Sequence, residues 1–315
     1  MITPSHRIAI LILVFYFFGC SNPSASNDKS VTGPVDDSTE TDTELPVNLE
    51  ILYTQLDSTI FVSIAEKYSF DGEKKTDRGK MIIEIAKKFL GTPYVASTLE
   101  TDGEEKLVIN LRELDCTTFV EYVLAMSFSF NSKSSTFNDF ARNLALIRYR
   151  DGIPDGYPSR LHYFTDWMVN NSGKGIVEIV SNEFGNDQMP DSIYFMSANP
   201  QFYRQLSDAK YLNQVRETEH EMASHKLKYL TKDRIDEHAH LIQDGDIIAF
   251  KTTVKGLDVS HNGFAVHVNG RLHLLHASLN RKEVEITARP LQEYLSGIRN
   301  VQGILVARPV LPDHP

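Results

Sequence analysis

Residues 259–277 read VSHNGFAVHVNGRLHLLHA and predict a β-hairpin. The pair Asn269-Gly270 separates two runs of β-branched and apolar residues, and this dipeptide is the strongest short-range signal for a two-residue hairpin turn. Further short β-rich runs occupy residues 246–251, 283–287 and 304–307. The C-terminal third of the chain is therefore expected to form an antiparallel sheet.

Helical patterns dominate the part of the chain before this sheet. Apolar residues recur at helical spacing over residues 77–90, and Gly91 and Pro93 end that pattern. Residues 182–243 carry no clear signal. Helices followed by antiparallel strands indicate an α+β domain. The further elements expected are helices over 119–126, 137–149, 161–170 and 290–295 and a strand over 176–180.

The N-terminus has the build of a bacterial export signal. Arg7 precedes an uninterrupted apolar run at residues 8–18, which is 11 residues long. A membrane-spanning helix needs about 20 apolar residues, so this run is too short to be one. The following Gly19-Cys20 resembles the lipobox of bacterial lipoproteins, which implies acylation of Cys20 and a signal peptide over residues 1–20. An ordinary cleaved signal peptide is the alternative.

The segment that follows is expected to be a disordered tether. Residues 21–46 are rich in Ser, Asn, Asp, Thr and Pro, and they hold too few apolar groups to offset the entropy lost on folding. Residues 47–315 are then expected to form a single elaborated domain, acting as a monomer in the cell envelope, in the periplasm or at the outer membrane. A net charge of −10 argues against a nucleic-acid partner.

Cys116 is the candidate nucleophile. The chain has only two cysteines, so the assignment of Cys20 to the anchor leaves Cys116 without a disulfide partner. It stands just before the helix predicted at residue 119 or on its first turn, and a helix N-terminus favours the reactive thiolate. The alternative is a buried structural cysteine that packs as a small hydrophobic residue.

A histidine of the hairpin would have to act as the general base for the Cys116 thiol. His261 and His267 fall on the same face of a regular strand, so alternation alone does not choose between them. The Ser-His-x-Gly context favours His261. Antiparallel pairing would bring His276 beside His261 if the two share a face, whereas His273 lies next to the turn.

Four motifs together resemble the NlpC-type cell-wall cysteine peptidases. They are GTPY at 91–94, DCTTFV at 115–120, SHNGFAV at 260–266 and LHA at 275–277. The resemblance implies a papain-like α+β fold, with helices packed on an antiparallel sheet or half-barrel. It also implies that Cys116 is the nucleophile, His261 the general base and His276 the residue that orients it, with Tyr94 reaching into the site.

The chain further resembles the N-acetylmuramoyl-L-alanine amidase-like branch of that superfamily. The nucleophile motif continues as DCTTFVE, a large insertion separates Cys116 from His261, and that insertion contains YPSRLHYFTDW at residues 157–167. This resemblance implies hydrolysis of the amide between the muramic-acid lactyl group and L-alanine. The expected substrate is peptidoglycan or a muropeptide.

Substrate contacts are expected from the same motifs. Muropeptides carry carboxylates, which a guanidinium binds in bidentate fashion, so Arg160 is a candidate for recognition. Trp167 is a candidate for stacking on a sugar. An internal ion pair and a core position are the respective alternatives. The remaining candidates are Asp115, Ser159 and Ser260.

The expected chemistry uses no metal and no cofactor. A thiolate–imidazolium pair of Cys116 and His261 would attack the amide and form an acyl-enzyme. His220 and His225 are five residues apart, whereas the zinc-protease motif needs two histidines at i and i+4 on one helix face. The alternatives are a D-glutamyl–diamino-acid endopeptidase and a non-catalytic lipoprotein that binds cell-wall fragments.

Overall fold

The computed structural model describes residues 50–68, 77–131, 135–190 and 192–311. The predicted signal peptide, Cys20 and the tether of residues 21–46 lie outside the described residues. Within the described ranges, no helix is long and apolar enough to cross a membrane.

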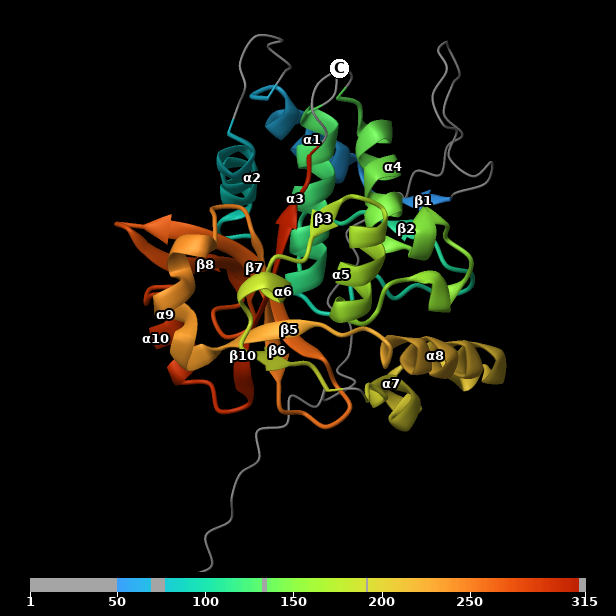
Figure 1. Cartoon of the computed structure of the whole chain (residues 1–315). Helices are drawn as coiled ribbons and strands as arrows, with labels where there is room; N and C mark the ends of the chain where they lie inside the picture. Colours follow the sequence, from blue (N-terminus) through green and yellow to red (C-terminus); the bar gives the residue numbers. More distant parts are fainter. Residues whose placement is uncertain (1–49, 69–76, 132–134, 191, 312–315) are drawn as a thin grey trace, which may run out of the picture.

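An eight-stranded antiparallel sheet forms the base of the molecule (Figure 1). Its strand order is β4-β5-β10-β6-β7-β8-β9, and β3 pairs with β10 beside this path. A separate two-stranded sheet is parallel. The main sheet comprises β3 (Val177–Glu178), β4 (Asp187–Gln188), β5 (Lys228–Thr231), β6 (Ile247–Thr252), β7 (Val259–Val268), β8 (Arg271–Ser278), β9 (Glu283–Ile286) and β10 (Val301–Pro309), and the small sheet comprises β1 (Ile51–Leu52) and β2 (Leu107–Val108).

The predicted hairpin is confirmed as β7 and β8. Asn269 and Gly270 form the turn with φ angles of 50° and 77°. Positive φ at both central residues is what a type I′ turn requires, and Asn and Gly tolerate it best. The turn therefore fixes the register, in which Phe264 stands opposite Leu275.

The predicted helices are confirmed, with shifted ends. Asp77 caps α2 by accepting a hydrogen bond from the Lys80 amide, and Gly91 follows with φ at 82°. The helix predicted over residues 119–126 is longer in both directions. The helices are α1 (Gln55–Ala65), α2 (Arg78–Ala86), α3 (Cys116–Phe130), α4 (Phe137–Arg148), α5 (Phe164–Gly173), α6 (Ser181–Phe184), α7 (Phe195–Ala198), α8 (Ala209–Met222), α9 (Ile235–His238) and α10 (Leu291–Ser296).

Helix α8 was absent from the sequence-based prediction. Its sequence AKYLNQVRETEHEM is mostly polar, and only Val215, Glu219 and Met222 are buried. Val215 and Met222 pack in a small separate core with Tyr157, Tyr163 and other residues of the insertion, and Glu219 accepts a hydrogen bond from the Tyr163 hydroxyl. The helix is therefore stabilised by tertiary contacts, and its own sequence pattern is too polar to predict it.

Helix α3 lies at the centre of the main core. Apolar residues on all its sides are buried, and it packs against α2 and α4 and against the sheet at β7 and β8 (Figure 1). The Phe119 ring meets the Phe264 ring of β7 edge-on, with centroids 5.7 Å apart. This contact fixes the start of α3 against the middle of β7.

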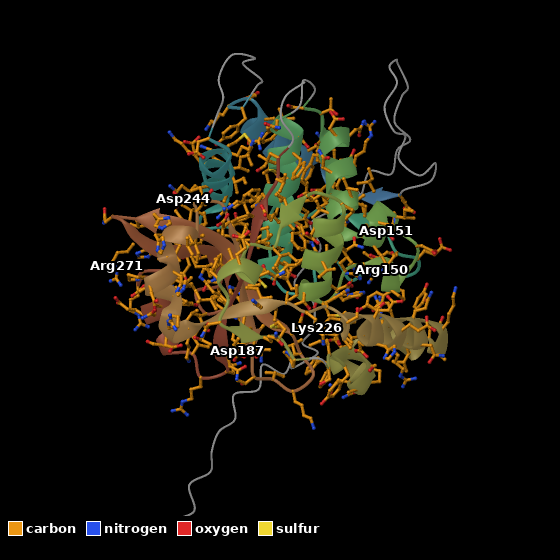
Figure 2. The ribbon with its side chains drawn as sticks, in the orientation of Figure 1. Arg150, Asp151, Asp187, Lys226, Asp244 and Arg271 are labelled. Carbon is orange, nitrogen blue, oxygen red and sulfur yellow. The ribbon has the colours of Figure 1, made fainter. Side chains whose placement is uncertain are left out.

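The sheet is buried on both faces. Along β6, Ile247 and Ala249 join the core beneath the helices, while Ile248 and Phe250 join a second core beneath α9 and α10. Charged side chains lie around the outside, among them Arg150 and Asp151 near α5 and Asp244 and Arg271 on the sheet side (Figure 2). The α+β class predicted from the sequence is confirmed.

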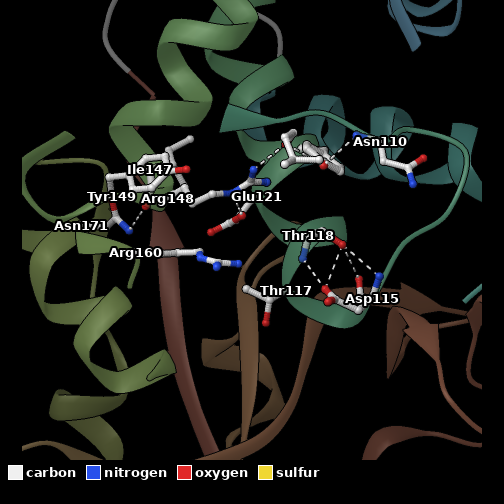
Figure 3. Close-up of polar contacts among 12 residues, drawn as sticks. Asn110, Asp115, Thr117, Thr118, Glu121, Ile147, Arg148, Tyr149, Arg160 and Asn171 are labelled. Atoms are coloured by element: carbon white, nitrogen blue, oxygen red, sulfur yellow. Dashed lines mark hydrogen bonds and ion pairs between the residues drawn. The ribbon is translucent and has the colours of Figure 1, made fainter. Parts of the chain in front are cut away.

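A buried ion pair ties α3 to α4. Arg148 Nε donates to Glu121 Oε2 at 2.7 Å, and both residues are at most 2% exposed (Figure 3). Arg148 Nη1 donates to the Val108 carbonyl at 2.7 Å, and the guanidinium lies 5.3 Å from the Tyr122 ring centroid. Burial works against the charge on both groups and raises the pKa of Glu121, whereas for Arg148 the Glu121 carboxylate offsets burial and the pKa is raised.

Glu121→Gln is expected to lower the free energy of unfolding by about 3 kcal/mol, because it leaves the Arg148 charge buried without its counter-ion. The urea midpoint and the melting temperature measure this loss. The exposed pair of Arg234 and Glu237 offers a matched control. Glu237→Gln should have little effect on stability, because water screens that pair, and an equal effect of both variants would contradict the role of burial.

Candidate active site

The start of α3 meets β7 at Cys116. Cys116 is the first residue of α3 and is partly exposed, and Asp115 caps the helix by accepting from the Thr118 amide at 2.8 Å. Asn262 of β7 donates from its side-chain Nδ2 to Thr117 Oγ1 at 3.0 Å. The backbone of Asn262 also faces the Cys116 sulfur and acts to lower the pKa of the thiol. Asn262, the residue next to His261, therefore holds the first turn of α3, which carries the thiol, against β7.

Next to this contact, two histidines form a hydrogen bond with each other. His261 Nε2 and His276 Nδ1 are 2.6 Å apart, and their rings stand nearly perpendicular at 84°. His261 lies diagonally across the β7–β8 ladder from His276. A Cβ on Gly263 would come within 2.7 Å of the His276 Cβ. Gly263 thus makes room for the pair, which gives the Ser-His-x-Gly context a physical basis.

The other two histidines of the hairpin have different partners. His267 Nδ1 lies 2.7 Å from Asp244 Oδ1, at the far end of β7. His273 Nδ1 lies 2.7 Å from the Thr287 carbonyl and is mostly buried. The structure brings together His261 and His276 and leaves His267 and His273 outside the pair.

Burial favours the neutral forms of the thiol and of both imidazoles. It raises the pKa of Cys116 to about 12; the Asp115 carboxylate adds to this rise, and hydrogen bonds from Asn262 and Thr117 oppose it. Burial lowers the pKa of His261 to about 4. It also lowers the pKa of His276 to about 2, with a further contribution from His261. Burial therefore disfavours both charged forms of the predicted thiolate–imidazolium pair, because each is poorly solvated there.

Tyr94 lies next to the start of α3. It bridges to Leu114, directly before the α3 cap. Burial raises its pKa, with further contributions from Cys116 and Asp115, so its hydroxyl stays protonated as a hydrogen-bond donor.

The residues predicted to contact substrate differ in whether their polar groups already have hydrogen-bond partners within the protein. Ser260 is exposed on β7. The Asp115 carboxylate is already bonded to Thr118, through both the backbone amide and the hydroxyl. Ser159 donates to the Gly156 carbonyl at 2.7 Å and accepts from the Asp155 amide at 2.9 Å, so its hydroxyl closes a turn.

Arg160 and Trp167 lie in the surroundings that were the alternatives to substrate contact, an internal ion pair and a core position. Arg160 is 7% exposed and pairs with Glu100 at 3.1 Å and Glu105 at 3.2 Å. It also lies close to Glu121 (Figure 3). Trp167 has no exposed surface and stacks on Phe164, with ring centroids 5.0 Å apart. The expectation that Trp167 stacks on a sugar is wrong for this conformation, because the insertion folds over its own core.

Asn262 and Thr117 are site residues that the sequence analysis did not single out. Asn262 follows His261 directly, beside a register shift between β6 and β7, and its side chain reaches Thr117 of α3. Its position next to His261 was the available signal. Which helix its side chain meets was decided only by the packing of α3 on the sheet.

In the ranges that the structure describes, no group of three or more His, Cys, Asp or Glu side chains is arranged to hold a metal ion.

The two paired histidines predict a loss of stability in acid. Their ordinary pKa is about 6.5, and their folded values are about 4 and about 2, so the unfolded chain binds more protons below pH 6.5. Stability is therefore complete above that pH and falls as the pH drops toward 4, by about 1.4 kcal/mol per pH unit for each histidine. Urea midpoints at a series of pH values measure the slope. His276→Asn should flatten it, and an unchanged slope would contradict this origin.

Comparisons with known proteins agree with this architecture. Residues 84–304 match the family model described as AmiA-like, N-acetylmuramoyl-L-alanine amidase-like. The crystal structure of an N-acetylmuramoyl-L-alanine amidase from Bacteroides uniformis is 41% identical, with a TM-score of 0.71 over 74% of this chain and 99% of that one. No curated protein matches the chain.

Two other solved structures are similar. A Bacteroides fragilis protein, provisionally named a xylanase, is 41% identical, with a TM-score of 0.68 over 71% of this chain and 99% of that one. A Legionella pneumophila protein shares the fold at 20% identity, with a TM-score of 0.58 over 82% of this chain and 96% of that one.

Together these matches define an amidase-like peptidoglycan hydrolase. The chain belongs to the N-acetylmuramoyl-L-alanine amidase-like family.

Proposed function

We propose that this protein is a cysteine amidase that cleaves the bond between N-acetylmuramic acid and L-alanine in cell-wall fragments. One observation carries the proposal. The Cys116 thiol lies on the first turn of α3, which Asn262 of β7 contacts through Thr117, and His261, next to Asn262, is paired with a second histidine. A nucleophile, a base and a group that orients the base are the three parts that acyl transfer requires.

The proposed reaction begins from the neutral thiol. Because Nε2 of His261 is bonded to His276, Nδ1 is the nitrogen left to accept the thiol proton. The proton moves as the sulfur attacks the lactyl carbonyl carbon, so the unfavourable free thiolate need not accumulate. Backbone N–H groups at the start of α3 and the Tyr94 hydroxyl are suited to hold the oxyanion.

The second half of the reaction returns the enzyme to its starting state. His261 gives its proton to the L-alanine nitrogen as the C–N bond breaks, which leaves a muramoyl thioester on Cys116. Water, deprotonated by His261, then attacks the thioester. The C–S bond breaks, His261 returns the proton to the Cys116 sulfur, and the lactyl carboxylic acid leaves and ionises in solvent.

The proposed site differs from that of a glycosidase, which the name of the Bacteroides fragilis relative would suggest. Most glycosidases use a pair of carboxylates on either side of the scissile bond. Here the start of α3 carries a thiol, the neighbouring hairpin carries two paired imidazoles, and the Asp115 carboxylate is bonded into the helix cap.

We also propose an NlpC-type papain-like fold and a lipoprotein anchored through Cys20 in the cell envelope. Support comes from the four motifs and from the apolar run at residues 8–18 that ends in Gly19-Cys20. Residues 21–46 would then tether the enzyme to the membrane.

Mass spectrometry of defined muropeptides after digestion with the full chain tests the function. The expected products are the free sugar part and an intact peptide that begins with L-alanine. A cut within the stem peptide would instead assign the enzyme to the D-glutamyl–diamino-acid endopeptidases. Binding without any cleavage would favour a non-catalytic lipoprotein.

A further inference from the structure

His276 has one ring nitrogen without a hydrogen-bond partner. The residue is 1% exposed, and its Nδ1 is taken by His261. Its Nε2 is buried and, among the described residues, has no hydrogen-bond partner. An N–H at this position would lose its bond to water without gaining another, which is unfavourable. An N–H on His276 Nε2 therefore needs a hydrogen-bond acceptor nearby.

Glu285 is the charged group in position to supply it. Its Oε1 lies 3.7 Å from His276 Nε2, and its side chain is 22% exposed. Glu285 of β9 pairs directly with His276 of β8, so the two side chains share a face of the sheet. A small rotation of the Glu285 side chain would bring the oxygen to a charge-assisted hydrogen-bond distance of about 2.8 Å.

Two further groups adjoin Glu285. Arg281 Nε lies 3.7 Å from Glu285 Oε2, but its side chain is 67% exposed, so water weakens that attraction. The Tyr294 ring meets the His276 ring edge-on, with centroids 5.9 Å apart. Burial and the Glu285 charge raise the pKa of Tyr294, so its phenol stays neutral. Glu285 is thus left as the negative charge behind His276.

The placement of protons follows from the direction of the reaction. His261 must keep Nδ1 free to receive the thiol proton, so its own proton sits on Nε2 and is donated to His276 Nδ1. His276 must then carry its proton on Nε2. That is the nitrogen that faces Glu285.

We propose that Glu285 is a positioning residue, which fixes the tautomer of His276 and offsets the positive charge that forms on the histidine pair when His261 takes the Cys116 proton. For its effect on turnover, this inference rests on the proposed amidase function. The chain of groups then runs from Cys116 through His261 and His276 to a carboxylate at the edge of the sheet.

Kinetics on a defined muropeptide test the charge. Glu285→Gln keeps the shape and an acceptor oxygen but removes the charge, so kcat should fall about 10-fold to 100-fold with KM unchanged. Glu285→Asp should fall between that variant and the wild type. Glu283→Gln is the matched control, since Glu283 lies on the same strand opposite Ser278 and its neutralisation changes the net charge equally. Wild-type kcat in Glu285→Gln, or the same loss in Glu283→Gln, would overturn the proposal.

A second measurement needs no substrate. Nitrogen-15 NMR of histidine-labelled full chain reports the tautomer of each imidazole, and His276→Asn assigns the His276 signal. The wild type should show His276 protonated on Nε2, and Glu285→Ala should change its tautomer or shift its nitrogen resonances. An identical His276 signal in Glu285→Ala would refute the contact. If the wild type cleaves no muropeptide but the signal shifts, the proposed function fails while the positioning contact stands.

Discussion

Cys116→Ala is expected to abolish release of L-alanine peptides from muropeptides, with a loss of at least about 10⁴-fold in kcat. The sulfur forms the covalent bond to substrate in the proposed reaction, and no other residue can replace that step. Folding should be unaffected, because the side chain is small and partly exposed at the first turn of α3. Product analysis by mass spectrometry measures the loss, and the melting temperature checks the fold.

Two observations would separate a nucleophile from a packing cysteine. Cys116→Ser keeps the size of the side chain, yet it should also lose nearly all turnover, because an alcohol at this site is a much weaker nucleophile. Wild-type enzyme quenched in acid during turnover should carry a muramoyl group on Cys116. Full activity in either variant would remove Cys116 from the proposed mechanism.

His261→Ala should reduce kcat almost as far as Cys116→Ala, because the neutral thiol then has no base to take its proton. His276→Ala should cause a large but incomplete loss, since it only holds His261 in the correct tautomer and orientation. The measurement is kcat and KM for each variant on one muropeptide.

His267→Ala provides the control for this pair. It lies on the same face of β7 as His261 and is bonded to Asp244, away from the start of α3. Its turnover should stay at the wild-type level. A loss as large as that of His261→Ala would mean that the wrong histidine of β7 has been assigned as the base.

Local patterns in the sequence were sufficient for much of the fold. The Asn269-Gly270 turn sets the register of β7 and β8 through the backbone conformation that those two residues permit. The apolar run after Cys116 was predicted to be a helix, and because it is apolar on all sides the helix is expected to be buried. These elements could be predicted because their signals lie within a few residues of one another.

The site was predicted only in part. Strand alternation left His261 and His267 equivalent, and the four-motif resemblance selected His261. The pairing of His261 with His276 at 2.6 Å depends on the ladder register and on the absence of a side chain at Gly263. The predicted sugar contact of Trp167 is wrong because exposure is a property of the whole insertion.

What the sequence by itself determined is the α+β class, a helix that follows the thiol, and the hairpin that carries the histidines, since each follows from local patterning and turn chemistry. Tertiary structure alone decided how far the thiol and the two imidazoles are removed from water. Desolvation raises the pKa of Cys116 and lowers those of His261 and His276, because it penalises each charged form. It also placed Asn262 against α3 and Glu285 behind His276, because those contacts join segments that are far apart in the chain or on neighbouring strands.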